Sequence, residues 1–229
     1  MCISEFISVG VMMHIGFRCL EPALIYSSKE FSTSCAYDFS FGYTISEGYH
    51  YGTIFRDDLM PGPAKERNQL ADETEILQLW VLDCWLMNRD RDTYGNVLLA
   101  PAPKGKWFLV AADHSDCFMG ADYFCSGRCF EQAAEFRAVK YLDFFEAVVY
   151  DKGVTPIKET IAAVVRCADE LSSITQHVPP QWWDEAGIGP DALERCLINR
   201  ANNIEVFCDL GKWEGIANAI SGGQQILGM

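Results

Sequence analysis

Apolar positions recur with helical spacing just before the middle of the chain. Five large side chains there follow an i, i+3, i+4, i+7, i+8 pattern, which is typical of one buried helix face: Leu77, Trp80, Val81, Cys84 and Trp85. The pattern predicts a long helix from about Glu66 to Leu86.

The segment before this helix predicts smaller elements. Residues 4 to 15 form an apolar stretch followed by Gly16, which indicates a short helix with a glycine at its end. The run ALIYSS, residues 23 to 28, predicts a strand. Residues 29 to 64 are rich in Gly, Ser, Tyr and Pro, and their pattern predicts no definite element.

Two short apolar runs follow the long helix. They are NVLLA, residues 96 to 100, and WFLVAA, residues 107 to 112, separated by PAPKGK. Short apolar runs around a Pro/Gly turn predict a β-hairpin. Because a hairpin brings its two open ends together, Asn96 and Asp113 are expected to be neighbours.

The rest of the chain is predicted to be helical. We expect one helix over about 129 to 150, and another with Thr155 as its N-cap and Pro156 as its first helical residue. A last helix starts near Pro190 and has four inward residues: Leu193, Leu197, Ile204 and Phe207. Residues 215 to 229 are expected to form a loose tail.

These elements predict an α+β fold that is mainly helical, with a short hairpin at its centre. We divide the chain into a mixed segment at 1–64, a main lobe at 65–214 and a C-terminal tail at 215–229.

Composition narrows the possible partners. The 229 residues are 49% hydrophobic, enough for a sizeable core, and the net charge is −14. An acidic surface repels phosphate backbones and anionic lipid headgroups, so we expect neither nucleic-acid nor membrane binding. The ten cysteines are irregularly spaced and favour free thiols in a reducing cytosol over a metal site. The first apolar run lacks a basic flank and contains Glu5, so a cytoplasmic location is expected.

Residues 82 to 118 contain the side chains that suggest chemistry. Asp90 lies in the loop after the long helix, Asn96 opens the hairpin and Asp113 closes it. Phosphoryl transfer from ATP needs a carboxylate to orient the attacking hydroxyl and oxygen ligands for Mg²⁺. Each of the three residues is also an ordinary turn residue. Arg89 and Arg91 flank Asp90 and could either balance phosphate charge or pair with Asp90 and Asp92.

The sequence NRDRDTYGNVLL followed by LVAADHSDCF resembles the HipA-like kinases, whose catalytic loop is similar to that of the phosphatidylinositol 3- and 4-kinases. The segment SEFISVGVMMHIGFRCLEPALIYSS resembles the helix and strand between the lobes of these kinases. VPPQWWDEAG and LERCLINRANNI resemble their C-terminal motifs. The resemblance covers nearly the whole chain and implies a kinase-like C-lobe with a remnant of the small lobe.

The resemblance also implies roles for six residues. Asp90 would orient the acceptor hydroxyl, and Arg91 would stabilise the transferring phosphoryl group. Asn96 and Asp113 would hold Mg²⁺ against ATP. Glu5 matches the family's helix glutamate and His114 the histidine after the metal-binding aspartate; both are assigned to the cofactor site. The implied acceptor is a serine or threonine of a protein.

Two departures from the family pattern affect this interpretation. Asn96 follows Asp90 by six residues where the family usually has five, so Asp92 could share the role of the base. Only Lys29 and Lys65 precede Asp90, and neither suits the small-lobe lysine that binds phosphates. We therefore expect a partner or a longer chain to supply the missing lobe. An inactive, kinase-derived binding module and a small-molecule or lipid kinase remain as alternatives.

Overall fold

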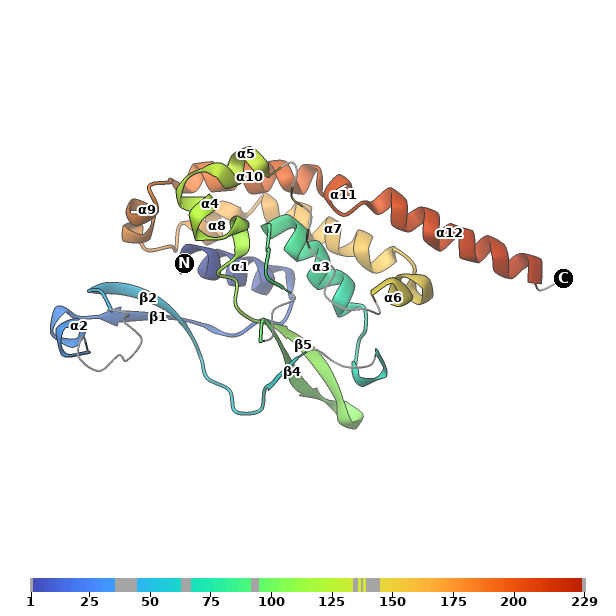
Figure 1. Cartoon of the computed structure of the whole chain (residues 1–229), viewed down its shortest axis with the longest axis horizontal. Helices are drawn as coiled ribbons and strands as arrows, with labels where there is room; N and C mark the ends of the chain where they lie inside the picture. The colour runs from blue at the N-terminus through green and yellow to red at the C-terminus, as the bar shows by residue number, and fades with distance from the viewer. Residues whose placement is uncertain are drawn as a thin grey trace.

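The structure is a computed structural model that describes residues 2–35, 45–62, 67–91, 95–133, 136, 138 and 145–227, with side chains described as far as 218 except for those of 34 and 35. It is a mixed α+β fold, mostly helical, with two small antiparallel sheets. Figure 1 shows the helices other than α2 gathered in one layer, with both sheets on the same side of it. This agrees with the α+β class expected from the sequence.

The first helix and strand are confirmed. Helix α1 spans Cys2–Ile15 and is followed by Gly16, whose φ of +86° is readily adopted only by glycine. Strand β1 spans Pro22–Ser27 and pairs antiparallel with β2, Gly48–Thr53. Helix α2, Lys29–Cys35, follows β1 in a segment for which the sequence predicted no definite element.

The β1–β2 ribbon extends away from the helical layer (Figure 1). Its Leu24, Ile25 and Tyr26 side chains are 45%, 54% and 58% exposed. One attachment to the helices is a hydrogen bond of 2.8 Å from Trp182 Nε1 to the carbonyl of Tyr49. The ribbon therefore presents apolar side chains to solvent.

The long central helix is shorter than expected. Helix α3 spans Glu75–Leu86, whereas a start near Glu66 was predicted, and Glu66 itself lies outside the described residues. Before it, Arg67–Gln69 form the 3₁₀ helix η1, and the Asp72 carboxylate accepts hydrogen bonds from the N–H and hydroxyl of Thr74. An Asp bonded to backbone two residues on favours a turn over a helix, which explains the late start.

The predicted hairpin is confirmed within the second sheet. Its order is β3 (Met60–Pro61), β4 (Val97–Ala102) and β5 (Lys106–Ala111), all antiparallel, and β4 and β5 are joined by the 3₁₀ helix η2 (Pro103–Gly105). The carboxylate of Glu75 fixes this sheet to α3. It accepts a hydrogen bond of 2.9 Å from the N–H of Leu109 and pairs with Arg18.

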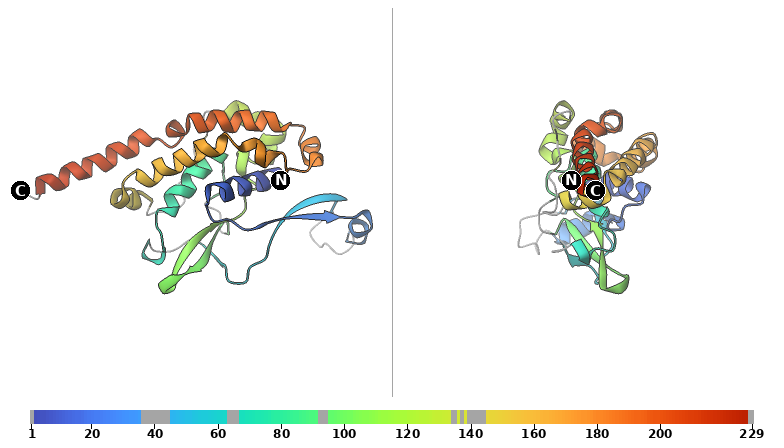
Figure 2. Two further views of the ribbon diagram at one scale, coloured as in Figure 1. Left: turned by 180° about the vertical axis from the view of Figure 1, so that it is seen from behind. Right: turned by 90° about the vertical axis from the view of Figure 1, so that its right-hand side faces the viewer.

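The C-terminal half is helical but differs from the prediction in three places. The single helix expected over 129–150 is wrong: α5 ends at Gln132, α6 begins at Phe145, and Phe136 and Ala138 lie in no helix. The N-cap of α7 is Val154, one residue before the predicted Thr155. Residues 215–227 belong to a long helix, α12, which extends well beyond the body (Figures 1 and 2), so the loose tail was wrong there; 228 and 229 lie outside the described residues.

The helical elements after the hairpin have the following bounds: η3 Cys117–Met119, α4 Ala121–Cys125, α5 Arg128–Gln132, α6 Phe145–Lys152, α7 Thr155–Ala168, α8 Leu171–Thr175, α9 Pro180–Ala186, α10 Pro190–Asn202, α11 Ile204–Phe207 and α12 Leu210–Leu227. Leu193, Leu197, Ile204 and Phe207 are buried as expected. Helix α3 lies at the centre of this bundle, and its Trp85 Nε1 donates to the carbonyl of Leu197 over 2.9 Å.

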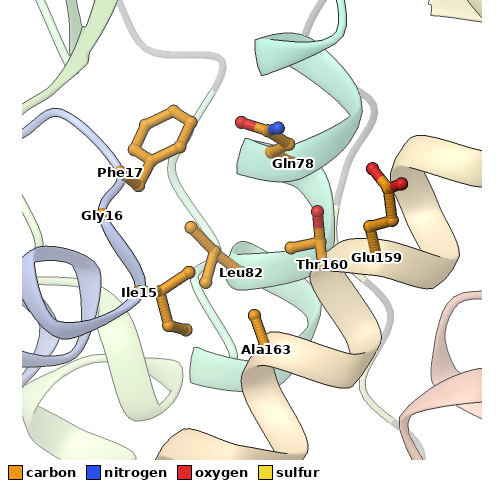
Figure 3. A pocket seen from close by; sticks show the side chains of 8 residues that line it. All are labelled: Ile15, Gly16, Phe17, Gln78, Leu82, Glu159, Thr160 and Ala163. Carbon is orange, nitrogen blue, oxygen red and sulfur yellow. The ribbon is translucent and has the colours of Figure 1, made fainter.

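A small cavity of about 180 Å³ lies where the end of α1 meets α3 and α7. Figure 3 shows Ile15, Leu82 and Ala163 lining it from these three helices, with Gln78 and Glu159 beside them. None of the residues singled out for chemistry lines this cavity. No helix in the described part of the chain is long and apolar enough to cross a membrane.

Candidate active site

A buried ion pair anchors the loop that follows α3. Arg91 Nε lies 2.9 Å from Asp83 Oδ2, and Arg91 Nη2 lies 3.0 Å from Asp83 Oδ1. Asn88 Nδ2 also donates to Asp83 Oδ1, over 3.2 Å. Asp83 belongs to the last turns of α3 and Arg91 to the loop, so this pair folds the loop back against its own helix. An unpaired charge here would be costly, because both side chains are excluded from water.

The remaining nitrogen of the Arg91 guanidinium, Nη1, joins the two ends of the hairpin. It donates to the carbonyl of Asn96 over 2.6 Å and to that of Ala112 over 2.8 Å. The N–H of Ala112 also donates to the carbonyl of Asn96, over 3.1 Å. One buried side chain thus holds together the loop of Asp90, the start of β4 at Asn96 and the backbone next to Asp113.

Asp90 and Asn96 are in direct contact. Asn96 Nδ2 donates to the backbone carbonyl of Asp90 over 2.6 Å and to its Oδ2 over 3.1 Å, while the Asp90 N–H donates to Asn88 Oδ1 over 3.0 Å. With its Nδ2 turned toward Asp90, Asn96 keeps its amide oxygen without a hydrogen-bond donor among the described residues. That oxygen is the atom a hard cation would use.

Asp113 follows β5 in a left-handed conformation with φ of +46°. Its Oδ1 accepts hydrogen bonds from the N–H of Ser115 over 3.1 Å and from the Ser115 hydroxyl over 2.6 Å. Partial burial alone would raise the pKa of Asp113. The Ser115 hydrogen bonds, a hydrogen bond with Glu5 and the charge of Arg91 outweigh burial and lower this pKa below its usual value. The group therefore stays a carboxylate at neutral pH.

Glu5 and His114 join the same network. The Glu5 carboxyl, on α1, shares a hydrogen bond with Asp113, and the nearby backbone N–H of His114 stabilises its charged form. Burial is the largest effect and raises the pKa of Glu5. His114 is buried, and its Nδ1 lies 3.2 Å from Arg91 Nη2. Since arginine can only donate, Nδ1 is the acceptor and Nε2 holds the proton. Burial, and then the charge of Arg91, lower the pKa of His114 well below its usual value, so the ring is neutral.

The structure therefore brings all six predicted residues into one connected network. Asp90 contacts Asn96, Arg91 contacts the backbone of Asn96 and the ring of His114, and Glu5 contacts Asp113. The sequence assigned no role at the site to three residues that complete it: Asp83, Asn88 and Ser115. The sequence did contain one sign of the buried ion pair. Asp83 lies inside an apolar helix, and a buried carboxylate needs a partner.

Several candidates lie elsewhere or outside the described residues. Asp92 and Lys65 belong to the segments that are not described. Lys29 begins α2 and is exposed, far along the ribbon from α3 (Figure 1). Within the described residues no lysine pairs with Glu5.

The donor atoms at this site suit Mg²⁺. Asn96 offers an amide oxygen and Asp113 a carboxylate, and Mg²⁺ prefers oxygen ligands and keeps several of its waters beside nucleotide phosphates. The described part of the chain contains no cluster of three His, Cys, Asp or Glu side chains that could hold a metal without such help. The cysteines described, including Cys125 and Cys129, are free thiols.

Comparisons with known proteins do not establish a family for this chain. No protein-family model matches the sequence, and no curated protein is detectably similar to it. A solved structure, the crystal structure of a Helicobacter pylori proinflammatory kinase, CtkA, superposes on 96% of this chain and 88% of its own with a TM-score of 0.45 and 10% sequence identity. A likeness this weak establishes neither the family nor the activity.

Proposed function

We propose that this protein is an ATP-dependent phosphotransferase of the HipA-like type, which transfers phosphate to a serine or threonine hydroxyl of another protein. The observation that carries the proposal is that the buried Arg91 guanidinium binds the backbone carbonyls of Asn96 and of Ala112, the residue before Asp113, while the Asn96 side chain contacts Asp90. Three oxygen-bearing side chains from a loop and two strand ends form the set of groups that phosphoryl transfer needs.

In this proposal Asp90 accepts a hydrogen bond from the acceptor hydroxyl and orients it for attack. Asn96 holds Asp90 in place through Nδ2 and presents its amide oxygen to Mg²⁺, and Asp113 provides the second protein ligand. Mg²⁺, when bound with ATP, neutralises charge on the phosphate oxygens. The low pKa of Asp113 keeps this ligand ionised at neutral pH.

Arg91 has a different role from the one that the resemblance implied. A contact with the transferring phosphoryl group does not fit its position, because the guanidinium is only 1% exposed and is engaged by Asp83 and two carbonyl groups. We assign it a positioning role: it holds the Asp90 loop against the hairpin. His114 Nδ1 accepts a hydrogen bond from Arg91 Nη2, the nitrogen that also contacts Asp83.

An inactive binding module remains a second candidate, and the Glu5–Asp113 contact favours it. Two carboxyl groups share a hydrogen bond at the position where one of them would bind the metal. In an active kinase a lysine pairs with the helix glutamate and the phosphates, and no lysine in the described residues does so here. This module would bind a nucleotide without transferring phosphate.

Incubation of the purified chain with Mg²⁺ and γ-³²P-labelled ATP, with casein and myelin basic protein as acceptors, tests the proposal. We expect slow incorporation of label that depends on Asp90, with Asp90→Asn losing at least about 100-fold of the rate. Asp122→Asn, an exposed aspartate on α4, is the matched control. Label incorporation that survives Asp90→Asn would contradict the catalytic assignment. Normal Mg-ATP binding with no incorporation would favour the binding module.

A further inference from the structure

Two arginines lie on one tyrosine ring beside the candidate active site. The guanidinium carbon of Arg89 is 5.2 Å from the centroid of the Tyr123 ring, and that of Arg128 is 4.5 Å from it. Both arginines are exposed, and Tyr123 is half-buried on α4. We call Arg89, Tyr123 and Arg128 the arginine patch. Each cation is attracted by the ring, so both positive charges are held beside Tyr123.

A second contact, an ion pair with Asp116, also fixes the position of Arg89. Its Nη2 donates to Asp116 Oδ1 over 2.7 Å. Gly120 lies directly against this pair with φ of +81°, and a Cβ at Gly120 would collide with Arg89 Nη2 and lie 2.6 Å from Asp116 Oδ1. Any other residue at Gly120 would displace the pair. The absence of a side chain at Gly120 thus leaves room for the Arg89–Asp116 ion pair.

The arginine patch borders the residues of the proposed reaction. Arg89 directly precedes Asp90, and Asp116 is three residues after Asp113. A backbone hydrogen bond of 3.0 Å from Met119 N–H to the carbonyl of Met87 joins the segment before Arg89 to the segment that follows Asp116. Arg89 and Asp90 are thus neighbours in one loop, and that loop is attached to the one that follows Asp113.

The charge of the arginine patch differs from that of the whole protein. The chain has a net charge of −14, yet among the described residues Arg128 makes no ion pair and Arg89 pairs only with Asp116. A guanidinium group can bind a carboxylate through two of its N–H groups at once. An acidic acceptor would be repelled by the rest of the surface, so this patch would decide where it binds.

We propose that the arginine patch binds an acidic side chain next to the hydroxyl that receives the phosphate, so that the acceptor is an acidic segment of a protein. This deepens the proposed phosphotransferase function and rests on it. The ligand is assigned to the acceptor because Arg89 adjoins Asp90, the residue that orients the acceptor hydroxyl, whereas Asn96 and Asp113 serve the phosphate donor.

Peptide binding tests the proposal without requiring activity. The probes are two fluorescein-labelled peptides with one central serine, flanked by glutamates in one and by glutamines in the other, and binding is followed by fluorescence anisotropy at 50 and 200 mM salt. We expect the intact chain to bind the glutamate peptide about three- to fivefold more tightly, the size expected for exposed charge contacts, with a smaller preference at high salt. Arg128→Gln should remove the preference. Arg166→Gln, which removes an exposed arginine on α7, should keep it.

Equal binding of the two peptides by the intact chain would overturn the proposal, as would an unchanged preference in Arg128→Gln. Binding by Asp90→Asn separates this inference from the proposed function. We expect that variant to keep the preference for the glutamate peptide while losing phosphotransfer. If the intact wild-type chain shows the preference but transfers no phosphate, the acceptor role is refuted and a binding site for acidic peptides remains. Phosphotransfer by the intact wild-type chain without the preference would refute the patch alone.

Discussion

Arg91 Nε lies 2.9 Å from Asp83 Oδ2, and each of the two side chains is only 1% exposed. The pair joins the end of α3 to the loop that carries Asp90, and through the carbonyls of Asn96 and Ala112 it also joins the two hairpin strands. The geometry of the whole candidate site therefore depends on one buried charge pair.

Removing one partner of this pair should be more damaging than removing both. Arg91→Met leaves the Asp83 carboxylate buried without its cation, so we expect a loss of about 3–5 kcal/mol in the free energy of unfolding. The double variant Asp83→Leu/Arg91→Met should lose less than the sum of the single variants. Urea unfolding followed by circular dichroism measures these values, with Arg195→Met, on the exposed face of α10, as control. Additive losses would show that the two residues do not interact.

Asp113→Asn should weaken Mg²⁺-dependent nucleotide binding without unfolding the chain. The change is nearly isosteric and removes one negative charge from the proposed metal ligands, and Ser115 can still donate its hydrogen bonds to the amide oxygen. We expect about a tenfold or greater loss of Mg-ATP affinity by calorimetry and an unchanged unfolding midpoint. Equal Mg-ATP affinity of the two proteins would argue against the metal role of Asp113.

The buried Glu75 should give the protein a pH-dependent stability. Burial, the largest effect, raises the pKa of Glu75 above 4.5, although the N–H of Leu109 and the charge of Arg18 act in the opposite direction. Because the folded state then holds this proton more tightly than the unfolded state, the stabilisation is complete below pH 4.5 and is lost as the pH rises through the folded pKa. Glu75→Gln has no such proton to lose.

Urea unfolding at a series of pH values from 4 to 7 measures this effect. We expect the free energy of unfolding of the wild-type chain, relative to that of Glu75→Gln, to fall across the range. A difference between the two proteins that rises with pH would mean that the ion pair with Arg18 outweighs burial, and the assignment of a raised pKa would be wrong.

The chain by itself should transfer phosphate slowly. Glu5 shares a hydrogen bond with Asp113, and within the described residues no lysine neutralises this pair of carboxyl groups. Positioned cations provide a large part of the rate of phosphoryl transfer. We expect a turnover at least about 100-fold below the roughly 1–100 s⁻¹ typical of kinases, measured from initial rates of label transfer. Rates within that range, dependent on Asp90, would show that no further cation is needed.

Local pattern was sufficient to predict several elements of the fold. The apolar stripe around Trp80 marked the central helix, the two apolar runs marked the β4–β5 hairpin, and Gly16 marked the end of α1. The hairpin also placed Asn96 near Asp113, because pairing in an antiparallel ladder follows from the turn between the strands. These features depend on residues that are close together in the sequence, so the sequence alone is sufficient to predict them.

The tertiary structure alone decided what these residues contact. From the sequence, Arg91 could either pair with a neighbouring carboxylate or face a phosphate. In the structure it is buried against Asp83 and the carbonyls of Asn96 and Ala112, because segments up to 21 residues apart in the chain pack together there. The contact of Glu5 with Asp113 and the position of Arg89 on Tyr123 likewise join segments that are far apart in the chain. Charge and hydrogen bonding act over a few ångströms of space, whereas the sequence reports only distance along the chain.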